Sequence, residues 1–268
     1  MRNIFLSLFA AALLVGGTGG APLAASAAET LTPLSALAAG DLIRGQAFPA
    51  VYYYGKDGFR YVFPNDKTYK SWYGDDFSTV KWISDTDLGK IQIGGNATYK
   101  PGFKMLKINS DARTYAVSEN GELRWVTSES VAVSLYGIDW NTKIDDVPDA
   151  YFGNYHLGSD VEVADDFNPT AEMNAAKSID MDKDLESPAT LDITDNAYSS
   201  ATLKVKAGTA VRFENKGTSN HTVTADDLSW GSGTMHTGDV YSRYFTEPGT
   251  YSYFCSYHPS MTAKIVVE

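Results

Sequence analysis

The chain has 268 residues, of which 43% are hydrophobic and 21% charged, a composition that excludes a wholly disordered chain, a collagen and a coiled coil. The 33 acidic and 22 basic side chains give a formal net charge of −11, which argues against sequence-independent nucleic-acid binding and against docking on anionic membranes, because both need Lys and Arg. The length predicts about two domains, and the single cysteine excludes an internal disulfide framework.

The first 27 residues have the three parts of a secretory signal peptide. Arg2 gives a positive start, an apolar run covers residues 4–15, and an Ala-x-Ala site lies at Ala25 and Ala27. The glycine-rich stretch 16–20 ends the run too early for a membrane-spanning helix, which needs about 20 apolar residues. We expect removal of residues 1–27, leaving 21 basic and 33 acidic residues and a net charge of −12. The protein is predicted to be secreted, periplasmic or at the cell surface, with no membrane span in its mature form.

Two stretches in the middle of the chain repeat one another. The offset is 64 residues at Tyr61 and Trp125 and 63 residues at Tyr73 and Tyr136, a period that indicates duplicated supersecondary units. Each unit has two aromatic and β-branched runs around a turn, then a capping residue, a short helix and a glycine stop. The first unit places these features at 56–58, Asn65, 66–73 and Gly74; the second places them at 119–121, Ser128, 129–136 and Gly137. Earlier runs at 42–44 and 104–108 would add a third strand to each unit. We predict a β-rich α+β domain of two repeats over residues 41–158.

Aromatic residues are abundant in this domain. The large rings are Tyr52, Tyr53, Tyr54, Trp72, Tyr73, Trp82, Trp125 and Trp140. Burial in a small duplicated core is the preferred interpretation, because such a domain needs large apolar side chains; a platform for a ligand or cell-wall glycan is the alternative. The repeat is similar to modules of uncharacterised bacterial surface proteins, a resemblance that implies no activity.

An acidic segment follows the repeats. Residues 160–186 contain nine acidic and two basic side chains, with turn signals at 168–169 and 187–188 around a short predicted helix at 171–177. We predict a solvated, self-repelling linker over 159–187. The alternating acids at Asp180, Asp182 and Asp184 resemble the start of a calcium-binding loop, but the glycine and the distant glutamate of such a loop are missing.

The last eighty residues alternate in the manner of short strands separated by Gly and Pro turns. The runs are 201–206, 211–214, 221–224, 241–245, 250–255 and 264–267. This pattern is typical of a β-sandwich or barrel. In the run 250–255, a period of two puts Tyr251, Tyr253 and Cys255 on one face.

A soft ligand set follows from the residues around the cysteine. Cys255, His258 and Met261 form a Cys-x-x-His-x-x-Met motif, and His221 begins another strand. Two imidazoles, a thiolate and a thioether suit copper in a trigonal arrangement with a weak axial Met. Calcium and magnesium prefer oxygen ligands, and a thioether is not among the usual ligands of zinc. His236 lies in a turn-like setting and is read as a surface histidine.

Residues 188–268 resemble a cupredoxin, the type 1 (blue) copper domain of the plastocyanin and amicyanin group, which is a Greek-key β-sandwich. The matching stretches are 205–208, 213–216, 221–223 and 247–261, and the two-residue spacings resemble amicyanin. The resemblance implies one copper, with His221, Cys255 and His258 as equatorial ligands and Met261 as the axial ligand.

The resemblance also implies supporting residues and an exchange edge. Asn215 would tie the first ligand segment to Ser256, and Pro259 would stiffen the loop and give the edge of His258 an apolar rim. In the family, electrons enter and leave at that edge. The expected function is an extracytoplasmic carrier of single electrons through Cu(I)/Cu(II), docking transiently on redox partner proteins near His258.

Three alternatives to the carrier follow from the same residues. An enzyme with a second copper centre is disfavoured, because the chain has four histidines and the neighbours of Cys255 are Phe254 and Ser256. A copper scavenger would be expected to show Met- or His-rich tracts, which this sequence does not have. A surface or cell-wall-associated binding protein, with contact through the repeats and a non-redox copper domain, is the runner-up.

Overall fold

The structure is a computed structural model that describes residues 30–268. The predicted signal peptide, 1–27, lies outside the described residues. Within residues 30–268, the structure contains no helix that is both long and apolar enough to cross a bilayer.

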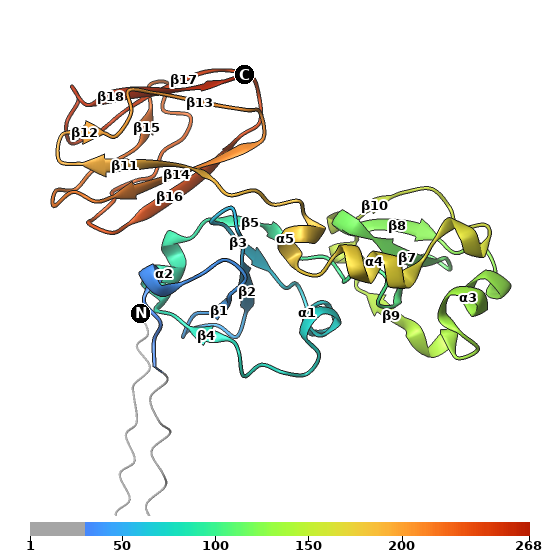
Figure 1. Ribbon diagram of the computed structural model, residues 1–268. Helices are drawn as coiled ribbons and strands as arrows, with labels where there is room; N and C mark the ends of the chain where they lie inside the picture. The colour runs from blue at the N-terminus through green and yellow to red at the C-terminus, as the bar shows by residue number, and fades with distance from the viewer. Residues whose placement is uncertain (1–29) are drawn as a thin grey trace, which may run out of the picture. The chain divides into compact units, whose positions relative to one another are not determined.

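The two repeats have the same topology (Figure 1). The first contains β1 (Leu42–Arg44), β2 (Val51–Tyr54), β3 (Arg60–Val62), α1 (Asp66–Tyr73), β4 (Lys81–Trp82), α2 (Asp85–Lys90) and β5 (Ile93–Asn96). The second contains β6 (Met105–Ile108), β7 (Thr114–Ser118), β8 (Glu122–Trp125), α3 (Glu129–Tyr136), β9 (Ile144–Val147) and β10 (His156–Leu157). The sheet orders are β4-β1-β2-β3-β5 and β10-β8-β7-β6-β9. Each is an antiparallel three-stranded meander flanked by two strands that pair in parallel.

The helices of the repeats begin and end where their capping residues predict. The side chain of Asn65 accepts a hydrogen bond from the backbone of Thr68, and that of Ser128 accepts one from Val131. Gly74 and Gly137 end the two helices with φ values of 65° and 92°, a backbone region that favours glycine. The predicted hairpins and both helices are therefore confirmed.

The acidic segment is more ordered than a solvated linker, which corrects that prediction. It contains α4 (Pro169–Ala175) and α5 (Ile179–Asp182). Phe167 packs in a core cluster of the second repeat, whereas Ile179 and Leu185 pack in a cluster of the first. Because these apolar side chains are buried, the acids between them are held in place despite their mutual repulsion.

The same segment does not gather its acids into a cation site. Asp182 is buried, whereas Asp184 is exposed. Asp180 accepts a hydrogen bond from the backbone of Lys56 instead. Within residues 30–268, this triplet is not among the groups placed to hold a metal ion.

The C-terminal domain is a sandwich of two four-stranded sheets (Figure 1). One sheet has the order β12-β11-β14-β16 and the other β13-β18-β17-β15. The strands are β11 (Ala189–Thr194), β12 (Ala197–Tyr198), β13 (Thr202–Val205), β14 (Thr209–Asn215), β15 (Thr224–Ala225), β16 (Val240–Phe245), β17 (Gly249–Phe254) and β18 (Thr262–Val267). Phe213, Tyr253 and Ile265 are fully buried in the shared core. Residues 221–223, predicted as part of a strand, make only an isolated bridge from His221 to Met235.

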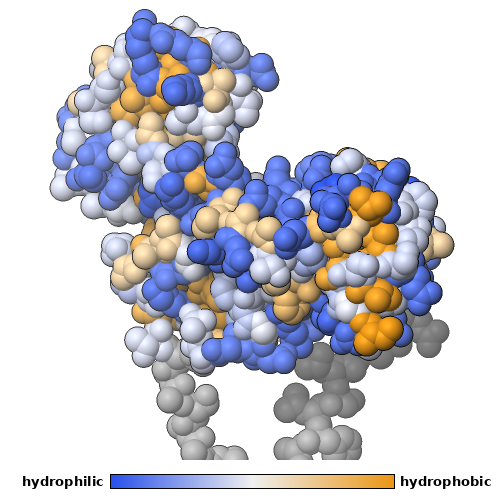
Figure 2. Space-filling view, turned by 45° about the vertical axis from the view of Figure 1, so that its right-hand side comes forward, coloured by the Kyte–Doolittle hydropathy of each residue, from blue (hydrophilic) through white to orange (hydrophobic). Residues whose placement is uncertain are grey.

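The face seen in Figure 2 is mostly hydrophilic, in keeping with the acidic composition. Figure 2 also shows an apolar strip on the second repeat, at the right of that view. The exposed apolar side chains of this repeat include Ile138 and Leu157.

Candidate metal centre

The cysteine and its neighbours lie in a tight loop between β17 and β18. Three backbone hydrogen bonds close this loop: Cys255 donates to Met261 (3.0 Å), His258 to Cys255 (3.1 Å) and Met261 to His258 (2.8 Å). His221 comes from a separate segment, which two backbone hydrogen bonds with Met235 hold in place. The loop and this segment therefore bring together residues more than thirty positions apart.

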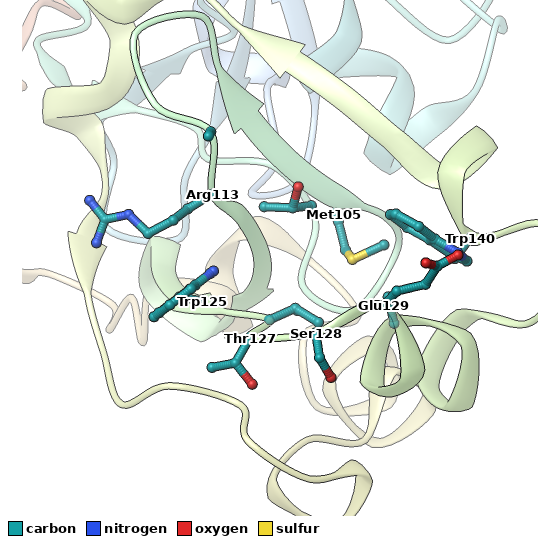
Figure 3. A pocket seen from close by; sticks show the side chains of 11 residues that line it. Met105, Arg113, Trp125, Thr127, Ser128, Glu129 and Trp140 are labelled. Carbon is teal, nitrogen blue, oxygen red and sulfur yellow. The ribbon is translucent and has the colours of Figure 1, made fainter.

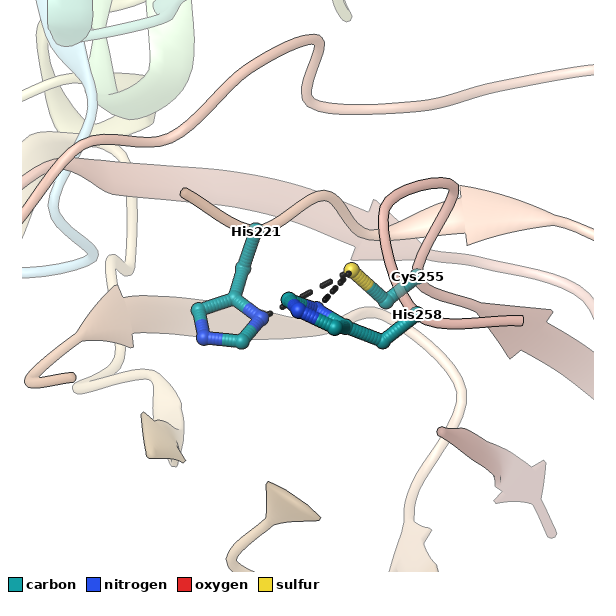
Figure 4. Close-up of side chains that lie close together, drawn as sticks. All are labelled: His221, Cys255 and His258. Carbon is teal, nitrogen blue, oxygen red and sulfur yellow. Dashed lines mark hydrogen bonds between the residues drawn. The ribbon is translucent and has the colours of Figure 1, made fainter. Parts of the chain in front are cut away.

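Three side chains converge at this point (Figure 4). Nδ1 of His221 and Nδ1 of His258 each lie 3.6 Å from Sγ of Cys255. One donor atom from each of the three residues falls within 4.8 Å of the others. His221 and Cys255 are fully buried, and His258 is partly exposed. Across residues 30–268, this is the one group of three or more His, Cys, Asp or Glu side chains placed to hold a metal ion.

The donor set fits copper. A fully buried imidazole is costly unless its nitrogens have partners, yet His221 points Nδ1 at a sulfur, while its Nε2 lies 3.6 Å from Oδ1 of Asp195, beyond hydrogen-bond distance. A metal ion bound between Nδ1 and the sulfur would give Nδ1 a stronger partner than the sulfur alone. Two imidazole nitrogens and a sulfur are the soft ligands that copper prefers.

Thr222 holds the two ligand segments together, a role that the sequence interpretation missed. Its backbone N–H points at Sγ of Cys255, 3.4 Å away. Its Oγ1 accepts a hydrogen bond from the backbone N–H of Ser256 (2.8 Å). Its carbonyl accepts a hydrogen bond from the hydroxyl of Tyr198 (2.7 Å). The signal available in the sequence was its position directly after His221.

Asn215 supports the site in a different way from the one expected. Its side-chain amide donates to the carbonyls of Ser219 and Met235, both at 2.9 Å, and its oxygen accepts from Gly217. It therefore fixes the segment on either side of His221. The hydrogen bond to Ser256, predicted for Asn215, is made by Thr222. A residue adjacent to His221 reaches Ser256, whereas Asn215 lies six positions earlier on β14.

A carboxylate shapes the loop before His221. Asp195 accepts hydrogen bonds from the backbones of Ser219 (3.0 Å) and Thr218 (2.9 Å) and from the hydroxyl of Thr218 (2.8 Å). These bonds, with the backbone of Ser219 foremost, lower the pKa of Asp195 to about 2. The carboxylate thus stays ionised and keeps its hold on the loop over the ordinary pH range.

The remaining predicted site residues lie in the same loop. Met261 is 4% exposed and packs in the core of the sandwich. Pro259 and Ser256 are exposed on either side of His258. Of the four predicted ligands, His258 is the one that reaches the surface.

The other two histidines lie outside the group. His236 is exposed, and its ring nitrogen Nδ1 lies 3.2 Å from Oδ2 of Asp239. Asp239 also pairs with Lys90 (2.9 Å). His156 lies on β10 of the second repeat and is exposed. These positions agree with the interpretation of His236 as a surface residue, and His156 falls within the predicted repeat domain, 41–158.

Comparison with known proteins points to one family for this part of the chain. The cupredoxin-like domain matches residues 171–267. Amicyanin from Paracoccus denitrificans is 35% identical over 83 residues, which are 29% of this chain and 63% of that protein. Amicyanin-alpha from Methylorubrum extorquens is 35% identical over 74 residues, which are 25% of this chain and 60% of that protein. The chain thus spans about three fifths of the length of these curated relatives.

Solved structures of copper proteins are also similar. A copper-containing nitrite reductase from Thermus scotoductus is 28% identical, and the match covers 31% of this chain and 23% of that one, with a TM-score of 0.30. The family model and the amicyanin relatives identify the C-terminal sandwich as a cupredoxin domain of the amicyanin and plastocyanin group, and His221, Cys255 and His258 are the group in it that is placed to hold a metal ion.

Proposed function

We propose that the C-terminal domain carries single electrons, outside the cytoplasm, between redox partner proteins. The observation that carries this proposal is the assembled donor set, with two Nδ1 atoms 3.6 Å from one buried sulfur. Copper, when bound, supplies a centre that alternates between Cu(I) and Cu(II). Cys255, His221 and His258 would hold it through one sulfur and two imidazole nitrogens, and the thioether of Met261 would be a fourth, weaker ligand.

The hydrogen bonds around the ligands support fast exchange. Three backbone bonds close the ligand loop, and Thr222 ties it to the segment of His221. Ligands that are fixed by the fold keep their positions when the charge of the metal changes, so little rearrangement accompanies electron transfer. The N–H of Thr222, 3.4 Å from Sγ, stabilises negative charge on the sulfur and thereby helps to set the reduction potential.

We further propose that partners dock around His258. His258 is the ligand with an exposed edge, and exposed Tyr257 and Pro259 flank it. The hydroxyl of Tyr257 bonds that of Thr234 (2.8 Å), which fixes this side of the rim. A small rim of this kind suits the weak encounters of redox proteins, which typically bury less than about 1,200 Å².

The same residues favour a carrier over a catalyst. Substrate reduction at copper needs an open ligand position or a second metal centre with its own histidines. The two remaining histidines, His156 and His236, are exposed on separate elements, and His236 is engaged with Asp239. The nearer neighbours of the group, Thr222 and Ser256, are hydrogen-bonded to each other.

Spectroscopy of the copper-loaded protein tests the metal site. We expect an intense absorption near about 600 nm from a short copper–thiolate bond, and its loss in Cys255→Ser. His236→Ala is the matched control, because it removes a histidine outside the group and should keep the band. A colourless protein, or a band that survives Cys255→Ser, would overturn the site.

Voltammetry separates a carrier from a store. A carrier should show a reversible one-electron wave and should pass electrons to a soluble redox protein. His258→Gly, supplied with free imidazole to restore the ligand, should keep the band but slow the exchange with that protein. A copper site that binds without a reversible wave would refute electron transfer while leaving the copper assignment intact.

A further inference from the structure

The second repeat contains a cavity of about 310 Å³ beside its helix α3 (Figure 3). Trp125 and Arg113 lie on one side of it, Trp140 and Glu129 lie on the other, and Met105 lies between them. This volume is at the lower end of the range for ligand pockets, roughly 300–1,000 Å³. None of these residues belongs to the copper domain.

The same cavity is present in the first repeat, in a smaller form. A cavity of about 190 Å³ lies beside α1. Each residue that lines it has a counterpart 63 positions later among the residues that line the larger cavity. The cavity is therefore part of the repeated architecture, and the difference between the two copies lies in their side chains.

One pair of side chains explains why the second cavity is open. In the first repeat, the ring of Tyr69 stacks on that of Phe77, with centroids 4.2 Å apart and planes 8° from parallel. The counterparts in the second repeat are Ala132 and Trp140, which both line the larger cavity. Trp140 thus shares its cavity with the methyl group of Ala132, whereas Phe77 stacks on the ring of Tyr69. The second repeat therefore has no ring at the position of Tyr69, and the indole of Trp140 lines the cavity as a surface on which a ring can stack.

The polar groups of the cavity indicate the chemical class of ligand that could stack on Trp140. Arg113 lines the cavity, but its guanidinium is paired with Asp111 at 2.6 Å. Glu129 adds a second carboxylate, and Thr127 and Ser128 add hydroxyls. With its cation already neutralised, the cavity is poorly suited to phosphate or another anion. A purely apolar ligand would cover the exposed carboxylate of Glu129 and the hydroxyl of Ser128 and remove the water around them, which costs free energy.

We propose that the second repeat binds an uncharged saccharide, with one sugar ring stacked on Trp140 in the place that Tyr69 occupies in the first repeat. A pyranose has an apolar face of C–H groups that packs on an indole, and hydroxyls around its edge that pair with Arg113, Glu129 and Ser128. The proposal names a site for the glycan contact that the aromatic composition of the repeats suggested. It does not depend on electron transfer by the copper domain.

Titration of the full mature chain with soluble trisaccharides tests this site. The probes are chitotriose, cellotriose and maltotriose, each up to about 10 mM, a range suited to weak millimolar binding. We expect a saturable shift in tryptophan fluorescence and in the indole N–H signals of Trp125 and Trp140 with at least one probe. Trp140→Ala should weaken binding about tenfold, the effect of losing one aromatic stacking contact.

Two further variants keep the test independent of folding. Ala132→Tyr restores the residue type of the first repeat and should close the cavity and abolish the shift. Trp140→Phe, which copies Phe77, should retain binding within about threefold, because the stacking surface remains. Far-ultraviolet circular dichroism and the copper band of the other domain report whether each variant is folded. The absence of a saturable shift with all three probes, or an equal shift in Ala132→Tyr, would refute the site. Binding of a tryptophan-rich or proline-rich peptide at Trp140 in place of every sugar would also refute it.

Discussion

Thr222 links the two segments that carry the metal ligands. Its side chain lies between the segment of His221 and the loop of Cys255, and it is 6% exposed. Its Oγ1 also accepts a hydrogen bond from Thr224 (2.9 Å). A single hydroxyl thus satisfies two donors from different parts of the chain, which makes this residue a sensitive position for testing the rigidity of the site.

Thr222→Val removes the hydroxyl while keeping the shape of the side chain. We expect the free energy of unfolding to fall by about 1 kcal/mol, because the N–H of Ser256 and the hydroxyl of Thr224 lose their acceptor. Denaturant unfolding followed by circular dichroism measures this change. Ser256→Ala is the control, since it keeps the backbone donor and should cost much less. Equal stability of Thr222→Val and the unmodified protein would contradict the role assigned to Thr222.

Met261 is proposed as the axial ligand, and its removal should move the reduction potential. A thioether donates electron density that favours Cu(II), so Met261→Leu should raise the potential. A tenfold change in relative affinity for the two oxidation states corresponds to about 60 mV for one electron. Voltammetry measures the shift. Met235→Leu changes another buried methionine of the same core and should leave the potential in place. An unchanged potential in Met261→Leu would mean that Met261 packs in the core and does not bind the metal.

At the scale of elements, α5 shows how an acidic segment can be ordered. Asp182 at its end is 2% exposed and accepts hydrogen bonds from the backbone of Asn120 (2.8 Å) and the hydroxyl of Thr98 (3.1 Å). Burial is the main cause that raises the pKa of Asp182 to about 6. The folded state therefore binds a proton more tightly than the unfolded state, where the carboxyl titrates near its usual value.

This raised pKa predicts a definite pH dependence of stability. Between about pH 4 and pH 6, the folded state holds a proton that the unfolded state has lost, so stability falls as the pH rises. The contribution of Asp182 to this fall should be of the order of 3 kcal/mol by pH 7. Asp182→Asn should remove it and be more stable than the unmodified protein at pH 7. Asp184→Asn changes an exposed neighbour and should leave the pH dependence of stability almost unchanged. If the free energy of unfolding varies with pH in the same way for the unmodified protein and Asp182→Asn, the raised pKa of Asp182 would be contradicted.

At the scale of the molecule, we expect copper binding to be coupled to folding, because the candidate ligands come from two segments that only the fold brings together. Because the donor group exists only when 221 and 255–261 are in place, the ion should bind the folded state and stabilise it. Copper at about 100 times its dissociation constant should add about 2.7 kcal/mol to the unfolding free energy of the C-terminal domain. Calorimetry with and without copper measures this effect, and Cys255→Ser should lose most of it. A copper-independent transition in the unmodified protein would contradict the coupling.

The sequence by itself determined the local units and the ligand types. Asn65 and Ser128 predicted helix starts, and Gly74 and Gly137 predicted helix ends, because capping depends on residues within one turn. The spacing of Cys255, His258 and Met261 predicted a single loop, and the residue types predicted copper. Each of these inferences rests on interactions between near neighbours in the chain.

The tertiary structure decided which distant groups meet. Thr222, and not Asn215, reaches Ser256, and Asp195 holds the loop before His221, because the approach of strands far apart in sequence is not written in a local pattern. The acidic segment is ordered because its few apolar side chains find cores supplied by other elements. The open cavity of the second repeat emerged from the comparison of two folded copies, since the exchange of Tyr69 for Ala132 has meaning only where both side chains line the same space.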